Sequence, residues 1–146
     1  MKPTRELRDR LAEPGILVLP GAADAITAKV IEEAQFPAVY VTGAGFANAS
    51  FAVPDVGLIS MVEVTAHVQR ICEVVGIPVV VDGDTGYGGV LNVHRTVRQL
   101  ERAGAAAIQI EDQRDPKRCG HFDGQSVLPM ADMIDKLAAA CDARTD

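Results

Sequence analysis

The chain has 146 residues, and its 14 Lys and Arg against 20 Asp and Glu give a formal net charge of −6 at pH 7. This length predicts no more than one domain, and 48% hydrophobic with 23% charged residues is the balance of a globular rather than a disordered protein. We expect neither nucleic acid nor a membrane as a partner, because the chain is acidic and lacks the ~20-residue apolar run that spans a bilayer. Three irregularly spaced cysteines and a charged N-terminus without a signal peptide favour a reducing, cytoplasmic location.

Short apolar runs alternate with stretches whose apolar residues recur at helical spacing. The runs predict strands that are buried on both faces, at 16–19, 38–42, 77–81 and 105–110. The stretches between them predict helices at 4–12, 22–34, 60–75, 91–103 and from Pro129 to about Ala140. The Gly-rich residues 43–45 open a predicted loop that extends to about Leu58.

This alternation predicts an α/β fold, a parallel sheet with helices packed on it. Two architectures fit, an open doubly wound sheet and part of a (β/α)8 barrel, and both place functional residues just after the strands. A dinucleotide-binding fingerprint is absent, because Gly43-Ala44-Gly45 follows the second strand and continues as Phe46-Ala47-Asn48.

Acidic residues follow two neighbouring predicted strands, Asp82 and Asp84 after the third and Glu111 after the fourth. Converging carboxylates repel one another unless a cation lies between them, and Mg²⁺ is the hard cation that prefers such oxygen ligands. If strand geometry persists to Asp84, its side chain points to the same side as that of Asp82. The alternative for this Asp-Gly-Asp segment is a solvated turn. The Gly-rich residues 83–89 also suggest a phosphate-binding loop, although the ending of a nucleotide-binding loop is missing.

A basic segment, residues 117–121 with the sequence Lys-Arg-Cys-Gly-His, surrounds Cys119. Neighbouring cations favour the thiolate form of a cysteine, and a glycine beside it lets a substrate approach. An ordinary exposed loop cysteine fits the same spacing equally well. Cys72 and Cys141 lie on apolar helical patterns and are predicted to be packing residues.

Three segments together resemble the isocitrate lyase/phosphoenolpyruvate mutase superfamily, and most closely its methylisocitrate lyase and 2,3-dimethylmalate lyase members. They are residues 81–88 (Val-Asp-Gly-Asp-Thr-Gly-Tyr-Gly), 110–113 (Ile-Glu-Asp-Gln) and 117–121, and the similarity extends through the whole chain. The resemblance implies a (β/α)8 barrel and a Mg²⁺ or Mn²⁺ cofactor. It also implies carbon–carbon cleavage of a small carboxylate, of the 2-methylisocitrate or 2-alkylmalate type, through an enolate.

The resemblance also assigns roles to residues. The implied metal ligands are carboxylates, some acting through water: Asp55, Asp82, Asp84 and Glu111. The implied substrate contacts lie at the end of the second strand: Tyr40, Thr42, Gly43 and Ala44. The implied catalytic residues lie on a mobile loop, with the cysteine as the proton-transfer group: Lys117, Cys119 and His121.

Members of this superfamily are about twice as long as the present chain, in keeping with a complete barrel. We therefore expect residues 1–146 to form a single partial barrel domain, the N-terminal four strand–helix units of a longer barrel. Two unpaired sheet edges would favour a homo-oligomer. Two other functions stay open, an oxaloacetate decarboxylase or phosphonopyruvate-type enzyme, which Cys119 disfavours, and a truncated, inactive paralogue that acts as a scaffold.

Overall fold

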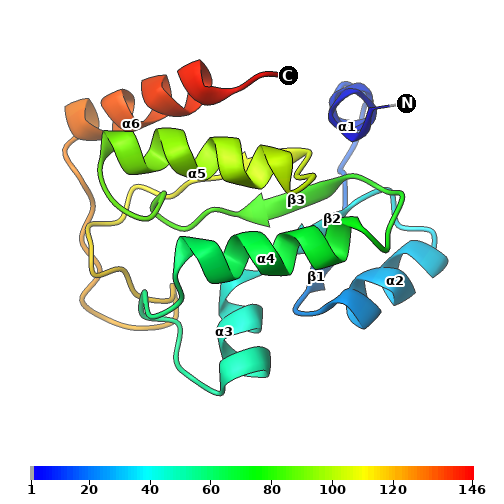
Figure 1. Ribbon diagram of the computed structural model, residues 1–146, viewed down its shortest axis with the longest axis horizontal. Helices are drawn as coiled ribbons and strands as arrows, with labels where there is room; N and C mark the ends of the chain where they lie inside the picture. The colour runs from blue at the N-terminus through cyan, green and yellow to red at the C-terminus, as the bar shows by residue number, and fades with distance from the viewer. Residues whose placement is uncertain (1) are drawn as a thin grey trace.

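The computed structural model describes residues 2–146. Within this range one parallel sheet has the strand order β1-β2-β3-β4, with bounds Gly21–Ala22, Val39–Val41, Val79–Asp82 and Ala107–Gln109. The helices are α1 (Pro3–Leu11), α2 (Ala25–Glu33), α3 (Gly43–Phe51), α4 (Met61–Cys72), α5 (Val90–Arg102) and α6 (Met130–Ala143) (Figure 1). The predicted α/β alternation is confirmed.

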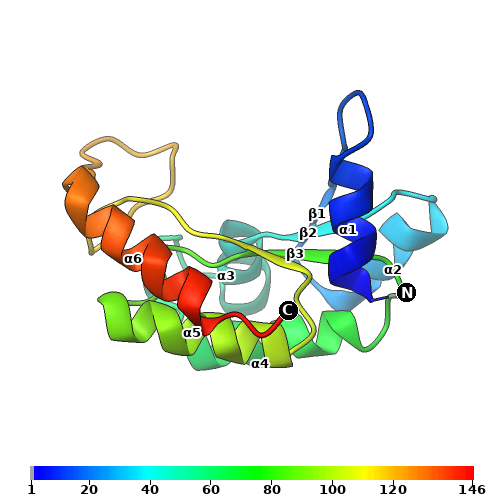
Figure 2. The same cartoon turned by 90° about the horizontal axis from the view of Figure 1, so that it is seen from above.

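The two faces of the sheet are covered differently. Figure 2 shows α4 and α5 along one side of the strands. The side chains on that side form the core with α4 and α5, and all are at most 2% exposed: Val39, Val41, Val79 and Val81. Alternate residues, such as Tyr40 and Val80, point to the other face and are half-buried. The prediction that the strands are buried on both faces is therefore wrong for this chain.

The first strand lies later in the sequence than predicted. Residues 16–19 are not paired in the sheet, and Ile16 and Val18 are 92% and 55% exposed. Pairing begins where the carbonyl of Pro20 accepts from the Tyr40 N–H at 3.0 Å. Because β1 is an edge strand with one neighbour, the apolar run before it has no partner to cover it.

A helix occupies much of the predicted loop after β2. Residues 43–51 form α3, and the Thr42 hydroxyl caps it by accepting from the Gly45 N–H at 3.1 Å. Gly45 suits this turn because a Cβ there would lie 2.5 Å from Cγ2 of Thr42. The alanines of this segment favour a helix, and buried Phe46 anchors it, so the glycines mark a tight helix start instead of a loop.

The remaining helices lie close to their predicted positions. Ser60 and Glu63 form the expected capping box of α4, with the Ser60 N–H donating to Glu63 at 2.8 Å. Helix α6 packs on α5. Cys72 is half-buried beside the core, but Cys141 is exposed, so its predicted packing role is wrong. Among the described helices, none combines the length and apolarity needed to cross a bilayer.

Candidate active site

The site is built around the turn that ends β3. Asp82 is the last residue of β3, and Asp84 has φ +54°, so the strand geometry expected to reach Asp84 stops before it. The Asp82 carboxylate closes the turn by accepting from the Asp84 N–H at 3.0 Å through Oδ1. Its Oδ2 accepts from the Gly43 N–H at 3.2 Å, which joins β3 to the first turn of α3.

A buried ammonium group lies among the carboxylates beside this turn. Lys117 is 6% exposed, and its Nζ lies 2.5 Å from Oδ1 of Asp55 and 3.2 Å from Oδ1 of Asp84. Burial raises the pKa of Asp84 to about 6, although the positive charge of Lys117 acts in the opposite direction. The side chain of Lys117 therefore holds its own loop to two others, the turn after β3 and the segment before α4.

Glu111 completes the acidic cluster from the β4 side. Its N–H donates to the carbonyl of Asp84 at 2.9 Å, and its Oε2 accepts from the Gln113 amide at 3.1 Å. Burial is the main cause that raises the pKa of Glu111, and the negative charges of Asp82 and Asp55 add to it. Asp55, Asp82, Asp84 and Glu111 thus lie at the same end of the sheet. The strand ends predicted this for Asp82, Asp84 and Glu111, and the resemblance alone implied Asp55.

The donor atoms of this cluster fit a hydrated divalent cation. Oε1 of Glu111 is buried yet has no hydrogen-bond partner among residues 2–146, and the buried Oδ1 of Asp84 has the Lys117 ammonium at 3.2 Å as its ion-pair partner. In the same range no three His, Cys, Asp or Glu side chains lie close enough to enclose a metal by themselves. Mg²⁺ matches this arrangement, because it binds through one or two carboxylates and retains several water molecules.

The predicted substrate residues lie next to the cluster. The Tyr40 hydroxyl donates to Oε1 of Gln109 at 3.2 Å, across β3. Burial, together with the charges of Asp82 and Glu111, raises the pKa of Tyr40 to about 12. The hydroxyl of Thr42 is used as the helix cap, and the Gly43 N–H at the start of α3 donates to Asp82. Ala44 follows in the same first turn and is half-buried.

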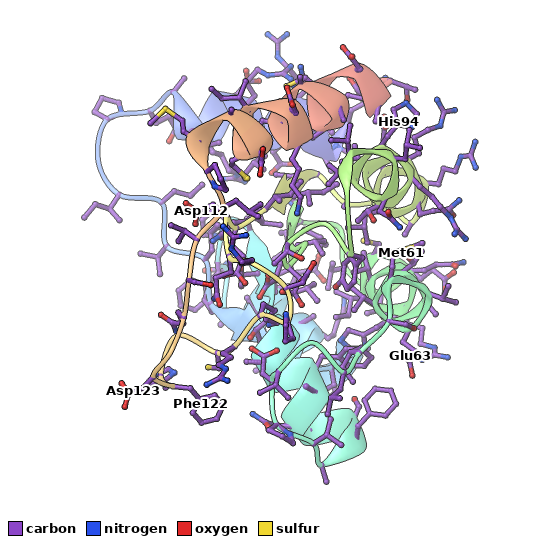
Figure 3. The ribbon with its side chains drawn as sticks, turned by 90° about the vertical axis from the view of Figure 1, so that its left-hand side faces the viewer. Met61, Glu63, His94, Asp112, Phe122 and Asp123 are labelled. Atoms are coloured by element: carbon purple, nitrogen blue, oxygen red, sulfur yellow. The ribbon has the colours of Figure 1, made fainter. Side chains whose placement is uncertain are left out.

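The loop between β4 and α6 carries the predicted catalytic cysteine. Sγ of Cys119 lies 3.3 Å from Nδ1 of His121, and the Cys119 N–H donates to the carbonyl of Asp55 at 2.9 Å. The other cations of the segment point elsewhere, Lys117 to the carboxylates and Arg118 to the carbonyl of Asp123 at 3.0 Å. The thiol therefore contacts an imidazole, whereas the sequence suggested a group of cations. Figure 3 shows Phe122 and Asp123 at the outer tip of this loop.

Sequence reasoning missed a support behind the turn that follows β3. Lys136 of α6 is buried, and its ammonium donates to the carbonyl of Thr85 at 2.9 Å. The Thr85 hydroxyl in turn donates to Asp115 at 3.1 Å, which ties the turn to the loop that carries Cys119. One signal was present, since Lys136 shares its helix face with the buried alanines Ala139 and Ala143.

A cavity of about 640 Å³ lies beside these residues. It extends from Asp84 and Lys117 to the first turns of α4 and α5, where Met61 and Asn92 lie. Nothing in the sequence pattern indicated it.

A parallel sheet with helices along one face and acidic side chains beyond the strand ends is the architecture of the (β/α)8 barrel enzymes. The four strand–helix units correspond to half of such a barrel. The family model described as phosphoenolpyruvate phosphomutase matches residues 7–146, and the chain belongs to this family. The resemblance to the isocitrate lyase/phosphoenolpyruvate mutase superfamily is thereby confirmed.

Two relatives and one solved structure show what the chain is similar to. The chain is 45% identical to 2,3-dimethylmalate lyase of Eubacterium barkeri over 146 residues, 100% of this chain and 50% of that protein. It is 46% identical to 2-methylisocitrate lyase of Aeropyrum pernix, over 99% of this chain and 47% of that protein. The crystal structure of a phosphonopyruvate hydrolase complexed with oxalate and Mg²⁺ superimposes with a TM-score of 0.88 at 37% identity, covering 100% of this chain and 50% of that one. The chain spans about half the length of the relatives it matches.

Proposed function

We propose that this chain provides the metal-binding and proton-transfer half of the active site of a carbon–carbon lyase. The substrate we propose is a small branched hydroxy-carboxylate of the 2-methylisocitrate or 2-alkylmalate type. One contact carries this proposal, because it joins the segment with the Cys119–His121 pair to the acidic cluster. The Cys119 N–H donates to the backbone carbonyl of Asp55, and Sγ of Cys119 lies beside Nδ1 of His121. The names of the lyase relatives support the same reaction class.

The acidic cluster would hold Mg²⁺ or Mn²⁺ through Asp84, with Asp82, Asp55 and Glu111 acting directly or through water, and the buried Oε1 of Glu111 has no hydrogen-bond partner among residues 2–146. When bound, such an ion polarises the α-oxygen and carboxylate of the substrate and so lowers the energy of the enolate formed on cleavage. The first turn of α3, with the Ala44 N–H, would orient a substrate carboxylate, since a helix N-terminus favours negative charge.

Cys119 would transfer the proton to or from carbon. Its Sγ can exchange a proton with Nδ1 of His121 at 3.3 Å, so the imidazole can keep the thiol in the protonation state that each direction of the reaction needs. This role separates proton transfer on the loop from metal binding at the strand ends.

The complete active unit that we propose also includes the other half of a barrel, from further residues of the same polypeptide or from a second copy. The β4 edge and the half-buried face with Tyr40 and Val80 are the surfaces such a half would cover. The expected cytoplasmic location and homo-oligomeric state stay predictions.

Replacing Asp84 by Asn tests the metal assignment. In the natural protein at its full length, we expect Mg²⁺-dependent cleavage of 2-methylisocitrate to fall about a thousandfold or more, because a catalytic metal contributes several kcal/mol. The matched control is Asp123→Asn, an exposed carboxylate at the loop tip (Figure 3), which should leave the rate unchanged. Retained Mg²⁺-dependent turnover in Asp84→Asn would contradict the assignment.

Replacing Cys119 by Ser distinguishes the lyase from the alternative that the phosphonopyruvate hydrolase structure favours. A lyase should lose about 100-fold or more in kcat with little change in KM, since proton transfer is lost and the metal site is intact. Cys141→Ser, an exposed thiol on α6, is the control. If Cys119→Ser keeps full activity and releases phosphate from phosphonopyruvate, the protein is a phosphonopyruvate-type enzyme. If the unaltered protein turns over neither substrate, the result favours an inactive paralogue that acts as a scaffold.

A further inference from the structure

The ammonium group of Lys117 occupies the position that the acidic cluster offers to a cation. It is almost fully buried, and it contacts Oδ1 of Asp55 at 2.5 Å and Oδ1 of Asp84 at 3.2 Å. Two ion pairs from one buried ammonium group balance part of the negative charge of the carboxylates around it.

A divalent ion on Asp84 would compete with Lys117 for the same carboxylate oxygen. Mg²⁺ binds carboxylate oxygens at about 2.1 Å, so an ion on Oδ1 of Asp84 would lie at most about 5 Å from the ammonium nitrogen. At that separation, in a buried site, the repulsion between a double and a single positive charge is strong. The metal also neutralises the carboxylates that keep Lys117 buried, and an ammonium without such partners is stable only in water.

The backbone near Lys117 connects this competition to the catalytic loop. Residues 117–119 are fastened to Asp55 by two contacts, the ammonium group of Lys117 and the N–H of Cys119 at 2.9 Å. When the ammonium group moves away, only the hydrogen bond from the Cys119 N–H to the carbonyl of Asp55 remains of these two contacts. The segment that positions the Cys119 thiol is thus less constrained with metal than without it.

We propose that Lys117 is a built-in cation that holds the acidic cluster together without metal, and that a divalent ion displaces it and thereby releases the segment that carries Cys119. This inference rests on the proposed metal site. It adds that metal binding and loop position are coupled through one side chain, so that each influences the other to the same extent.

Replacing Lys117 by Met tests the competition in the natural protein at its full length. Removal of the competing charge should tighten binding of Mg²⁺ or Mn²⁺ about tenfold or more, measured by calorimetric titration without substrate. Lys117→Arg keeps the charge and should bind the metal like the unaltered protein. Lys29→Met removes an exposed lysine paired with Glu32 and is the control for a change in net charge.

A second measurement needs no variant. Addition of Mg²⁺ to the unaltered protein should speed alkylation of Cys119 several-fold, as followed by peptide mass spectrometry, while the exposed Cys141 serves as the internal reference.

The outcomes separate this inference from the proposed function. Metal binding that is equal or weaker in Lys117→Met, or alkylation of Cys119 that Mg²⁺ does not change, would overturn the inference and leave the metal site standing. Failure of both the unaltered protein and Lys117→Met to bind Mg²⁺ or Mn²⁺ would overturn the metal site itself and the inference with it.

Discussion

On β3, neighbouring residues of the same type lie in different surroundings. Val79 and Val81 point toward α4 and α5 and are at most 2% exposed, whereas Val80 and Asp82 point to the opposite face and are half-buried. The helix-covered face is completed by residues of this chain, from α4 and α5. The face that carries Tyr40, Asp82 and Gln109 is the one that would line the interior of a barrel. The stability of this structure therefore comes mainly from one face, and the proposed chemistry from the other.

The adjacent valines test this difference most directly. Val81→Ala should lower the free energy of unfolding by about 2 kcal/mol, because two methyl groups leave a closed core. Val80→Ala removes the same atoms from the half-buried face and should cost less than about 1 kcal/mol in the 146-residue chain. Urea denaturation of both variants provides the measurement. Equal costs in this chain would show that the two faces are packed alike, contrary to the comparison.

The free energy of unfolding should also depend on pH through Asp84, which follows the half-buried face of β3. Because burial raises the pKa of Asp84 to about 6, against 3.8 when unfolded, the folded protein favours the protonated carboxyl. This contribution to stability is present below about pH 4 and is lost as the pH rises through 6. The free energy of unfolding relative to Asp84→Asn should thus fall by roughly 1 to 3 kcal/mol between pH 4 and 7.

The experiment is done in EDTA, because bound metal would stabilise the ionised form of Asp84. Asp123→Asn, an exposed carboxylate, should show no such pH dependence relative to the unaltered protein. A constant difference between the unaltered protein and Asp84→Asn over this range would contradict the role assigned to burial.

A smaller effect on the free energy of unfolding is expected at Ser60, where α4 begins and covers the buried face of the sheet. Ser60→Ala removes the hydroxyl that accepts from the Glu63 N–H and should lower the free energy of unfolding by about 1 kcal/mol. Ser50→Ala, at an exposed position near the end of α3, should change it by less than about 0.5 kcal/mol. Thermal denaturation of the two variants compares them, and equal effects would mean that the capping box adds nothing to α4.

The parts of the fold that depend on local pattern could be predicted from the sequence. Strands β2 and β3, the capping box of α4 and the meeting of Asp82, Asp84 and Glu111 follow from apolar runs and from the residues after them. The exposed run 16–19 could not be distinguished from a buried strand, because burial depends on neighbours that the sequence pattern does not show. Helix α3 was missed because glycine at a helix start was taken for a loop.

For the candidate site, the residue types indicated the chemistry but not the individual contacts. The sequence placed Lys117 beside Cys119, and three-dimensional proximity placed its ammonium group on Asp55, 62 positions earlier. The Asp-Gly-Asp segment combines both interpretations, because it is a turn in its backbone and an acidic cluster in its side chains. Contacts between loops far apart in sequence are set by the packing of the strands that carry them.

The strand order β1-β2-β3-β4 has a consequence for synthesis on the ribosome. Each strand pairs with the one made just before it, so every new strand–helix unit meets an edge that already exists. Pairing of this kind closes one short loop at a time and keeps the entropy cost of each step small. The sheet can therefore grow in the direction of translation, and β4, whose one neighbour among residues 2–146 is β3, is the strand that pairs last.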